Sequence, residues 1–392
     1  MSKANFAERV QWVMDNAERL SLIGNDFEAT FDDGHDLCWS KADKPLQFLA
    51  ACREFYGFWQ QGIDYCSGLG IALDGSNSGI QHFAAQGKTE TDGALVNLVP
   101  ADRPQDIYQA VADKVISVLE KDTSNKIAAE WMRFGITRKH VKRNVMTYCY
   151  SSGHYGFTEQ LMTDLMKPLH TEVLSGQRDK HPFDNPHKAA MLLSAENMNA
   201  IRIIIKGAAD GTRFYQKIAN ILAKRGDTMS WFTPIGFPVD NCYYKTSPHR
   251  LRLYLYDKEA ASKLDRKSMV LLRPTNRIDS RGCTNAISPN MIHSMDSTHL
   301  LMTVLACSSK NVRNFNLVHD SFSTHASDTD TLFRIVREEF VNLYSECMYT
   351  NILNQIKSHF NLSEEELAQL PAIPEKGTLD LAGILESDYC FA

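Results

Sequence analysis

The sequence predicts an α+β fold that is mostly helical, with a few strands that carry polar residues to tight turns. Most of the chain places apolar residues at helical spacing, as RPQDIYQAVADKVISVLEKD (103–122) does. Two stretches, CSGLGIALDGS and NFNLVHDSFSTHA, run from apolar residues into turn residues, and WFTPIGFPVDNCYYKTSPHRLRLYLYD alternates. Neither repeats nor low-complexity tracts interrupt the pattern. We therefore expect helices throughout, joined to a small number of short strands.

Helices are expected wherever the apolar period is close to 3.6 residues, and the polar stretch 170–187 is expected to be a mobile loop. One of these predicted helices is a long one near 328–356. The other predicted helices cover 5–22, 44–60, 78–86, 103–122, 126–134, 137–150, 155–168, 188–224 and 287–306.

Strands are expected in three places. Residues 71–73 read as a buried strand that stops at a turn, and residues 314–326 read as two short strands that turn at His319 and Asp320. The alternating segment reads as a hairpin with its turn near residues 246–249, where a proline and polar residues gather.

Length and composition limit the function only weakly. The 392 residues suggest two or three domains, and 43% apolar with 23% charged residues is typical of a globular protein. The net charge of −5 excludes a simple cationic coat for DNA or a membrane surface. It leaves open a nucleic-acid enzyme whose basic residues gather in one channel.

Cysteine usage and the first residues indicate a soluble intracellular protein. The nine cysteines are scattered, without a CxxC pair or the spacing of a zinc site, so we expect reduced thiols. The start, MSKANFAERVQWVM, lacks the apolar block of a signal peptide, and no apolar run is long enough to span a bilayer. No membrane partner is therefore expected.

Two aspartates stand at the ends of apolar strands, Asp74 in IALDGS and Asp320 in FNLVHDS. Either alone is an ordinary turn residue, because Asp-Gly and Asp-Ser are common turn dipeptides. Together, on adjacent strand ends, they predict a pocket of concentrated negative charge that divalent cations would relieve. Mg²⁺ suits such a pocket because it takes carboxylate oxygens and completes its shell with water and phosphates. Two such ions can clamp the attacking and leaving oxygens of a displacement at phosphorus.

A basic helix supplies the third element of the predicted site. In TRKHVKRNVMTYCYSS, Arg138, Lys142 and Tyr150 recur at spacings that keep them broadly on one side of a helix. Like charges four residues apart repel, so the pair is a poor stabilising device but a good receiver for a triphosphate. Tyr150 would stack or hydrogen-bond at the nucleoside end. The alternative is a solvated basic helix face.

Four ordered motifs carry a family resemblance. DGSNSGIQHFAA, GITRKHVKRNVMTYCYSS, SPNMIHSMDSTHL and LVHDSF resemble motif A, motif B, a following His-bearing helix and motif C of the phage-type single-subunit RNA polymerases. The similarity continues through NLVPADRPQDIY, TPIGFPV and the terminal ILESDYCFA, from about residue 7 to the end. It implies a DNA-directed RNA polymerase that transfers nucleotides from ribonucleoside triphosphates to an RNA 3′ end on a DNA template.

The resemblance implies roles for the acidic turn residues. Asp74 and Asp320 would be the metal-binding aspartates for two Mg²⁺ ions, with the backbone carbonyl of Gly75 as a further ligand. His319, beside Asp320, would help to position the primer 3′ end.

The resemblance also implies a nucleotide-binding set. Arg138 and Lys142 would bind the triphosphate, and Lys142 is also a candidate proton donor to the leaving pyrophosphate. Tyr150 and His293 would sense the ribose 2′-hydroxyl, and Tyr108 would assist around the bound nucleotide.

Other residues near these motifs are assigned to support. Gln81 and His82 in motif A are expected to pack or hydrogen-bond rather than to act as catalysts. Tyr155 and Phe157, which follow the motif B helix, are expected in the core, with stacking on template bases as the alternative.

The fold that the resemblance implies is a right-hand polymerase palm, a small antiparallel sheet with flanking helices, together with mostly helical fingers. Residues 1–90 would form the first part of the palm and residues 294–392 the second. The fingers would occupy residues 91–293, with the motif B helix and a hairpin over 239–256.

The predicted hairpin has two interpretations. It corresponds to the element that reads promoter DNA in some relatives, and Lys245, His249 and Arg250 near its tip would then touch phosphates. A plain surface hairpin is the alternative.

The chain departs from the family pattern in two ways. Ser151 follows Tyr150 where the family usually has glycine, which leaves the local geometry of nucleotide and template entry open. No DxxGR motif of the upstream palm strand occurs, although the start reads as a natural translation start.

The missing motif predicts a palm and fingers without thumb or N-terminal domain, the catalytic subunit of a split, heterodimeric podovirus-like polymerase. A second polypeptide would supply the thumb, the N-terminal region and the missing strand. The enzyme would work in the cytoplasm of an infected bacterial host, on a single-stranded template or with a recruiting factor.

Two other functions remain open. A family A DNA polymerase shares the palm layout, although HisAspSer in motif C and KRNVMT in motif B differ from the usual DNA-polymerase forms. A non-catalytic, polymerase-like template-binding subunit is the second, against which stand the retained Asp74, Asp320, Lys142 and Tyr150.

Overall fold

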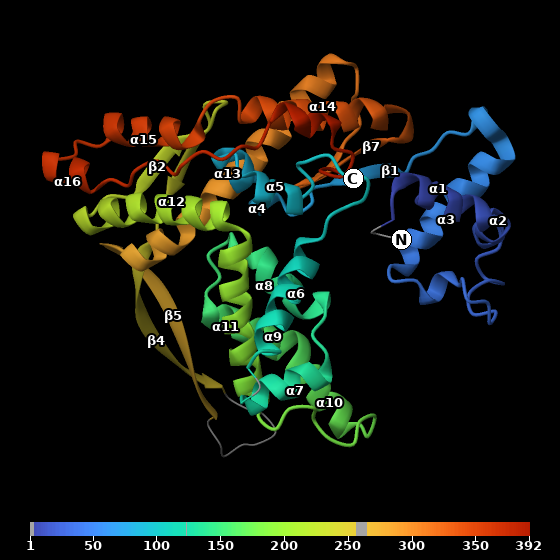
Figure 1. The fold of residues 1–392 in the computed structure, drawn as a ribbon, viewed down its shortest axis with the longest axis horizontal. Helices are drawn as coiled ribbons and strands as arrows, with labels where there is room; N and C mark the ends of the chain where they lie inside the picture. Colours follow the sequence, from blue (N-terminus) through green and yellow to red (C-terminus); the bar gives the residue numbers. More distant parts are fainter. Residues whose placement is uncertain (1–3, 123, 256–264) are drawn as a thin grey trace.

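The computed structural model describes residues 4–122, 124–255 and 265–392. Residues 70–95 and 280–392 build a broad layer of helices around a small sheet, and a helical bundle from residues 107–204 extends away from it (Figure 1). The predicted α+β class is confirmed, with most described residues in helices.

The small sheet has three antiparallel strands, β1 (Gly70–Asp74), β7 (Ser321–His325) and β6 (Asn316–Val318), in the order β1-β7-β6. The register sets Leu73 opposite Phe322 and Asp74 opposite Ser321. The predicted strands within 314–326 and the turn at His319 and Asp320 are therefore confirmed.

Helices cover this sheet and form the main core with it. Every residue of α4 (Ser78–Gly87) is buried, because α12 (Lys206–Arg225) and α13 (Ser280–Ser309) both contact it. The layer is completed by α5 (Glu90–Leu95), α14 (Thr329–Leu343), α15 (Met348–His359) and α16 (Glu364–Gln369).

Two predicted helices are each two helices. The 328–356 helix is interrupted at residues 344–347, where the buried Tyr344 leaves helical geometry and its hydroxyl meets Nδ1 of His82. The 188–224 helix is interrupted at the buried Ile205, which has φ −114° and ψ 65°. Because both break residues are apolar and buried, the apolar period continues through them and hides the breaks.

The bundle follows the prediction closely. The predicted loop 170–187 is wrong for its first five residues, since HTEVL completes the last turns of a helix that ends at Leu174. The bundle helices are α6 (Ile107–Leu119), α7 (Lys126–Phe134), α8 (Arg138–Tyr148), α9 (His154–Leu161), α10 (Lys167–Leu174) and α11 (Pro186–Ile204), with a π-helical turn (Met162–Met166) before α10.

A separate helical unit precedes the sheet and lies to one side of the body (Figure 1). It consists of α1 (Phe6–Asp15), α2 (Ala17–Asn25) and α3 (Pro45–Gln61), so the predicted 5–22 helix is broken at Asn16. Its small core forms apart from the main one, around Leu20, Ile23, Trp39 and Cys52.

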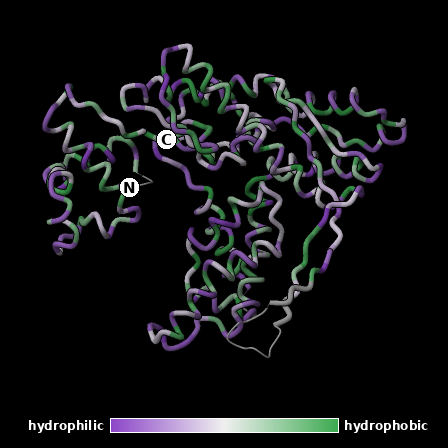
Figure 2. The backbone as a smooth tube through the Cα atoms, turned by 180° about the vertical axis from the view of Figure 1, so that it is seen from behind, coloured by the Kyte–Doolittle hydropathy of each residue, from purple (hydrophilic) through white to green (hydrophobic). Residues whose placement is uncertain are grey.

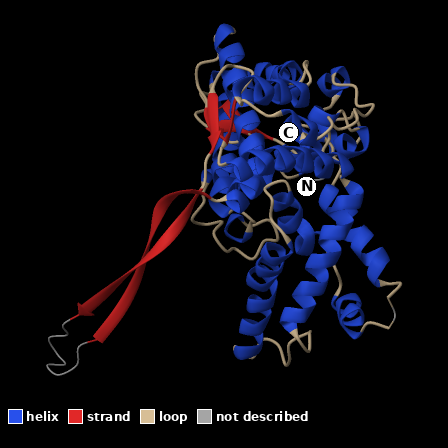
Figure 3. Cartoon of the chain, turned by 90° about the vertical axis from the view of Figure 1, so that its left-hand side faces the viewer, coloured by secondary structure: helices blue, strands red, loops and turns tan. Residues whose placement is uncertain are grey.

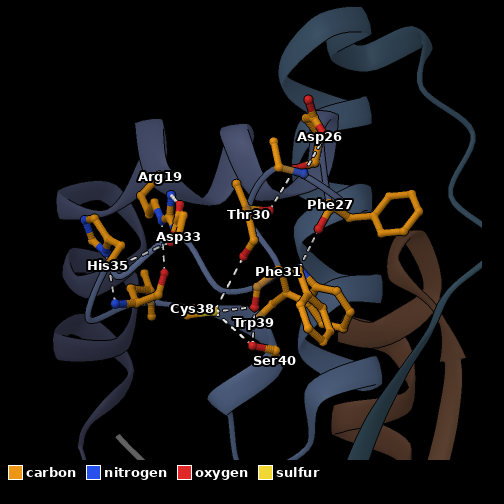
Figure 4. Close-up of polar contacts among 12 residues, drawn as sticks. Arg19, Asp26, Phe27, Thr30, Phe31, Asp33, His35, Cys38, Trp39 and Ser40 are labelled. Carbon is orange, nitrogen blue, oxygen red and sulfur yellow. Dashed lines mark hydrogen bonds and ion pairs between the residues drawn. The ribbon is translucent and has the colours of Figure 1, made fainter.

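Hydrogen bonds fix the long connection between α2 and α3 (Figure 4). Nε1 of Trp39 donates to the carbonyl of Phe27 at 2.9 Å, and both terminal nitrogens of Arg19 bind the Asp33 carboxylate at 2.7 and 2.9 Å. Side chains from α2 and from the connection itself thus order this segment.

Two hairpins lie between α12 and α13. β2 (Met229–Phe232) pairs with β3 (Pro238–Asn241), and β4 (Tyr244–Leu255) pairs with β5 (Asp265–Ile278) in a long ribbon that projects from the body (Figure 3). β5 carries four successive exposed apolar residues, 269–272, visible as an apolar stretch on the ribbon in Figure 2.

The predicted turn at residues 246–249 is wrong, because all four residues pair in register with β5. Pro248 opposes Leu272 there, and a two-stranded ribbon tolerates proline because each strand has one unpaired edge. Hence the predicted hairpin 239–256 covers only most of β3 and all of β4, and residues 256–264 lie outside the described residues. Across the described part of the chain, no helix is both long and apolar enough to cross a bilayer.

Candidate active site

The two predicted acidic residues meet at one end of the small sheet. β1 ends at Asp74, and the turn between β6 and β7 presents Asp320 beside it, where the Gly75 amide donates to the Asp320 carbonyl at 3.1 Å. A Cβ at position 75 would stand 3.3 Å from Oδ2 of Asp320. Glycine therefore lets the Asp320 carboxylate approach the backbone that follows Asp74.

Burial and neighbouring negative charge disfavour the ionised form of both carboxyl groups. Burial and the charge of Asp320 raise the pKa of Asp74 above its usual range. Burial and the charge of Asp296 likewise raise the pKa of Asp320. A cation at this position would relieve both effects.

A cavity of about 360 Å³ opens between the two aspartates and helix α8. Arg138, Lys142 and Tyr150 all line it, as do Asp74 and Asp320. The spacing on the basic helix thus brings its charged side chains to the acidic sheet end, as predicted, whereas a helix face in open solvent would not line a cavity.

Asp106 orients the basic side of this cavity and was not identified from the sequence. Its carboxylate accepts a hydrogen bond from Nε of Arg138 at 2.6 Å and caps α6 through the amides of Tyr108 and Gln109. The Arg138 guanidinium lies 4.9 Å from the Tyr108 ring centre, and the Lys142 ammonium lies 5.8 Å from it.

The signal for Asp106 was present in the sequence. An aspartate directly before an apolar-periodic helix is a typical N-cap. The predicted start at residue 103 placed it inside the helix.

Three aromatic rings run from the cavity toward the β6–β7 turn. The Tyr150 and His293 ring centres are 5.0 Å apart, and those of His293 and His319 are 6.4 Å apart. Burial and the charge of Asp296 raise the pKa of Tyr150 to about 12, so its hydroxyl stays protonated and can donate. His319 is exposed with φ +54°, which the tight turn imposes, and is not among the residues that line the cavity.

The last residues of the chain hold the backbone beside Asp74 in place. Gly75 bridges to Phe391, and the Ala392 amide donates to the Asp74 carbonyl at 3.2 Å. Gln81 Nε2 donates to the Cys390 carbonyl at 2.8 Å. The sequence pattern marked this terminal segment only as part of a resemblance and did not predict that it touches the site.

The motif A neighbours are buried support, as expected. Gln81 and His82 are both inaccessible to solvent and hydrogen-bonded. Phe157 is buried in the core, but Tyr155 is 79% exposed, so the core prediction is wrong for Tyr155. Tyr155 stands in the first turn of α9, where its neighbour at position 157 takes the inward direction.

Ser151 adopts the backbone conformation that glycine would favour. Its φ is +61°, in the left-handed region, and its buried hydroxyl has no hydrogen-bond partner among the described residues. The change from glycine keeps the turn after Tyr150 and adds both strain and an unpaired donor.

Lys245, His249 and Arg250 lie along β4 rather than at the tip of the ribbon. All three are exposed, and none is among the described residues that line the active-site cavity. A role for them in binding DNA remains a prediction.

Comparison with known proteins identifies the family. The family described as DNA-dependent RNA polymerase matches residues 1–369. T7 RNA polymerase of Escherichia phage T7 is 32% identical over 100% of this chain and 47% of its own length. The DNA-directed RNA polymerase of Enterobacteria phage K11 is 31% identical over 100% of this chain and 46% of its own.

Organellar enzymes match as well. Mitochondrial DNA-directed RNA polymerase 1 of Arabidopsis thaliana is 31% identical over 95% of this chain and 37% of its own length. The chain thus spans about half the length of the phage relatives and a smaller share of the mitochondrial relative. With the ordered motifs folded around one cavity, the chain belongs to the phage-type family of DNA-dependent RNA polymerases.

Proposed function

We propose that this chain is the catalytic subunit of a DNA-dependent RNA polymerase that transfers nucleotides from ribonucleoside triphosphates to an RNA 3′ end. The observation that carries the proposal is the shared cavity, in which Asp74 and Asp320 face Arg138 and Lys142. Carboxylates opposite cations suit a ligand that bears both metal ions and phosphates.

The residues present fit a Mg²⁺ site. Asp74 and Asp320 offer hard oxygen donors, and the Gly75 carbonyl, which accepts one hydrogen bond from Asn77, has a second lone pair available. No group of three or more His, Cys, Asp or Glu side chains suited to a metal occurs among the described residues, so water and substrate phosphates would complete the shell, as Mg²⁺ prefers. Two bound Mg²⁺ ions would supply charge neutralisation at the attacking and leaving oxygens.

The protein's own groups would position the nucleotide. Arg138, steered by Asp106, and Lys142 would bind the triphosphate, and Lys142 would give a proton to the departing pyrophosphate. This proton transfer removes charge from the leaving group. Positioning of this kind supplies much of the catalysis in phosphoryl transfer.

The aromatic residues would recognise the sugar and the primer. The protonated Tyr150 hydroxyl, with His293 beside it, would meet the ribose 2′-hydroxyl, which both donates and accepts hydrogen bonds. His319 would lie near the primer 3′ end. The Tyr108 ring would hold the Arg138 and Lys142 side chains, which lie over it, beside the bound nucleotide.

A second polypeptide is part of this proposal. Among the described strands, β1 is an outer strand of its sheet, and residues 70–72 are exposed. The free edge of β1 can therefore pair with a strand from another polypeptide. The partner would supply that palm strand, the thumb and the N-terminal region to a palm over 1–90 and 294–392 with fingers over 91–293. A single-stranded template or a recruiting factor, in an infected bacterial host, follows from the same proposal.

The test uses the native complex, purified through this chain. Asp320→Asn and Asp74→Asn should each abolish RNA synthesis on a single-stranded DNA template while template binding persists, because only the metal-binding charge is removed. Asp330→Asn, an exposed position on α14, is the matched control and should synthesise RNA normally. Preferred incorporation of deoxyribonucleotides would indicate a DNA polymerase, and unchanged synthesis in Asp320→Asn a non-catalytic role for this site.

A further inference from the structure

A cavity of about 670 Å³ lies in the helical unit that precedes the sheet, to one side of the body (Figure 1). Residues of α2 form one wall and residues of α3 the other, and Met14 and Asp15 at the end of α1 close one end. We refer to this cavity as the N-terminal groove. It shares no lining residue with the active-site cavity and is therefore a separate feature of the molecule.

The unit that contains the groove buries few apolar side chains for its size. Its core consists of four buried residues, Leu20, Ile23, Trp39 and Cys52. No residue of α1 is buried, although its apolar residues recur at helical spacing, and only Cys52 is buried among the 17 residues of α3. An apolar helix face is stabilised when another element covers it. Within the described part of the chain, the apolar faces of α1 and α3 are left largely open to solvent.

Three large apolar side chains line the groove and are exposed. Met14 is 55%, Leu22 49% and Trp59 57% exposed. The Trp59 ring stacks on Phe55, with ring centres 5.7 Å apart, so its position is already set before anything binds. Tryptophan often supplies a large share of the binding energy at protein interfaces, and methionine adapts its shape to a partner. A groove with these side chains is typical of a surface that another protein covers.

The charge of the groove indicates which kind of partner fits. Its charged lining residues are Asp15 and Glu18, both exposed, and no lysine, arginine or histidine lines it. A partner with positive charges beside its apolar residues would complement these carboxylates, whereas an acidic partner would be repelled. The groove therefore favours a basic binding segment.

The shape of the groove favours a helix as that segment. On α2 the lining residues 17, 18, 21, 22 and 25 recur every three or four positions, and residues 56, 59 and 60 do so on α3. Both walls are thus helical faces, whose ridges can receive the side chains of a third helix. The described residues of this unit contain no strand that an extended peptide could join.

We propose that the N-terminal groove binds a basic amphipathic helix of a partner protein. The apolar side chains of that helix would insert between α2 and α3 against Trp59, and its lysine or arginine residues would lie beside Asp15 and Glu18. This binding site is independent of the proposed function, because none of its residues lines the active-site cavity.

The test measures binding of the full chain to three fluorescent synthetic peptides by anisotropy. The first peptide carries leucines at helical spacing flanked by lysines, the second has glutamates in place of the lysines, and the third has the composition of the first in scrambled order. The lysine helix should bind at least about tenfold more tightly than either of the others, because it alone matches both the apolar walls and the carboxylates.

Two variants of the chain locate the binding site. Trp59→Ala should weaken binding of the lysine helix by roughly tenfold or more, the loss that follows removal of a dominant interface tryptophan. Asp15→Asn/Glu18→Gln should weaken binding and reduce its dependence on salt, because the attraction between exposed charges is screened by ions. All three side chains are exposed, so the fold should tolerate their replacement.

Matched controls replace exposed residues outside the groove. Tyr155→Ala removes an exposed aromatic ring, and Glu364→Gln/Glu365→Gln removes two exposed carboxylates from α16. Neither should change the affinity for the lysine helix. Equal binding of the lysine and glutamate helices, or an equal loss of affinity in these controls, would overturn the inference.

Crosslinking identifies the natural occupant. Leu22 is replaced by the photocrosslinking residue p-benzoylphenylalanine, the native complex is purified through this chain, and crosslinked peptides are sequenced by mass spectrometry. The expected product joins position 22 to a segment of another polypeptide in which lysine or arginine residues flank apolar residues at helical spacing. Crosslinks between two copies of this chain, crosslinks to an acidic segment, or the absence of any crosslink would contradict a basic helix as the occupant.

Discussion

Nε2 of His82 lies 2.7 Å from Oδ1 of Asp296, and both side chains are almost fully buried. His82 stands on α4, directly after the Asp74 turn, and Asp296 stands on α13, one turn after His293. Although burial disfavours its charge, the hydrogen bond with His82 keeps the pKa of Asp296 below its usual range. The pair therefore joins the helix that follows the Asp74 turn to the helix that carries His293.

Replacing His82 by leucine should lower the free energy of unfolding by about 3–5 kcal/mol, because it leaves Asp296 buried without its partner. Asp296→Asn should cost less, since the amide can still hydrogen-bond to the imidazole. Urea unfolding measures both changes and that of the double variant, which should be smaller than their sum. Arg334→Gln, which breaks an exposed ion pair with Glu338, is the control and should change stability by less than about 1 kcal/mol. Strict additivity would show that the two side chains do not interact.

Ser151→Gly should stabilise the protein by about 1 kcal/mol, because glycine has no side chain to disfavour a φ of +61°. Ser151→Ala separates the two contributions, since it removes the unpaired hydroxyl and keeps the strained backbone. Thermal unfolding should rank Gly above Ala. A glycine variant less stable than the alanine variant would contradict the strain.

Asp92 should make stability fall as pH rises. Burial raises the pKa of Asp92 to about 6, against about 3.9 in an unfolded chain, so the folded state binds the proton more tightly. At pH 4 the Asp92 side chain is neutral in the folded protein and does not lower the free energy of unfolding. Between pH 4 and pH 6 the unfolded chain loses this proton more readily than the folded protein, so the free energy of unfolding falls. The lower value persists above pH 6.

Asp92→Asn keeps an acceptor for the Ala208 amide, 3.1 Å away, and removes this cost. Relative to the unmodified protein, it should gain up to about 3 kcal/mol between pH 4 and pH 7 in urea unfolding. The exposed Asp330→Asn should show no such gain. A difference that does not vary with pH would mean that Asp92 is charged throughout.

Arg138→Gln and Lys142→Gln should each weaken ATP binding by about 1.5–3 kcal/mol, the usual contribution of a hydrogen bond to a charged group. Lys139 provides a control on the same helix, because it is exposed and does not line the active-site cavity. Fluorescence titration with a labelled nucleotide measures all three. If Lys139→Gln weakened binding as much, the effect would come from net charge rather than from the cavity.

The placement of the candidate site residues around one cavity was predictable, because strand ends and helix spacing fix their positions locally. Asp74 and Asp320 follow apolar strands, and the steps from Arg138 to Lys142 and Tyr150 match a helix, so each pattern is contained in a few residues. Roles such as proton donation by Lys142 stay predictions, since geometry alone does not show a reaction.

Features that depend on packing between distant segments could not be predicted. Ile205 ends a helix inside an unbroken apolar period, and the ribbon that contains Pro248 is longer than its turn residues suggest. Asp296 looks like a polar position in a helix until His82, more than two hundred residues away in sequence, is placed beside it. Packing decides such cases after local preference has allowed several outcomes.

The bridge between Gly75 and Phe391 has a consequence for how the enzyme is made. The strand that ends in Asp74 leaves the ribosome well before its pairing partners, β7 and the segment around Phe391. Pairings of such long sequence separation form slowly, because a large loop must close first. The nascent chain therefore cannot bring Asp74 and Asp320 together until those later segments have been made, so the cavity between them is among the last parts of the fold to form.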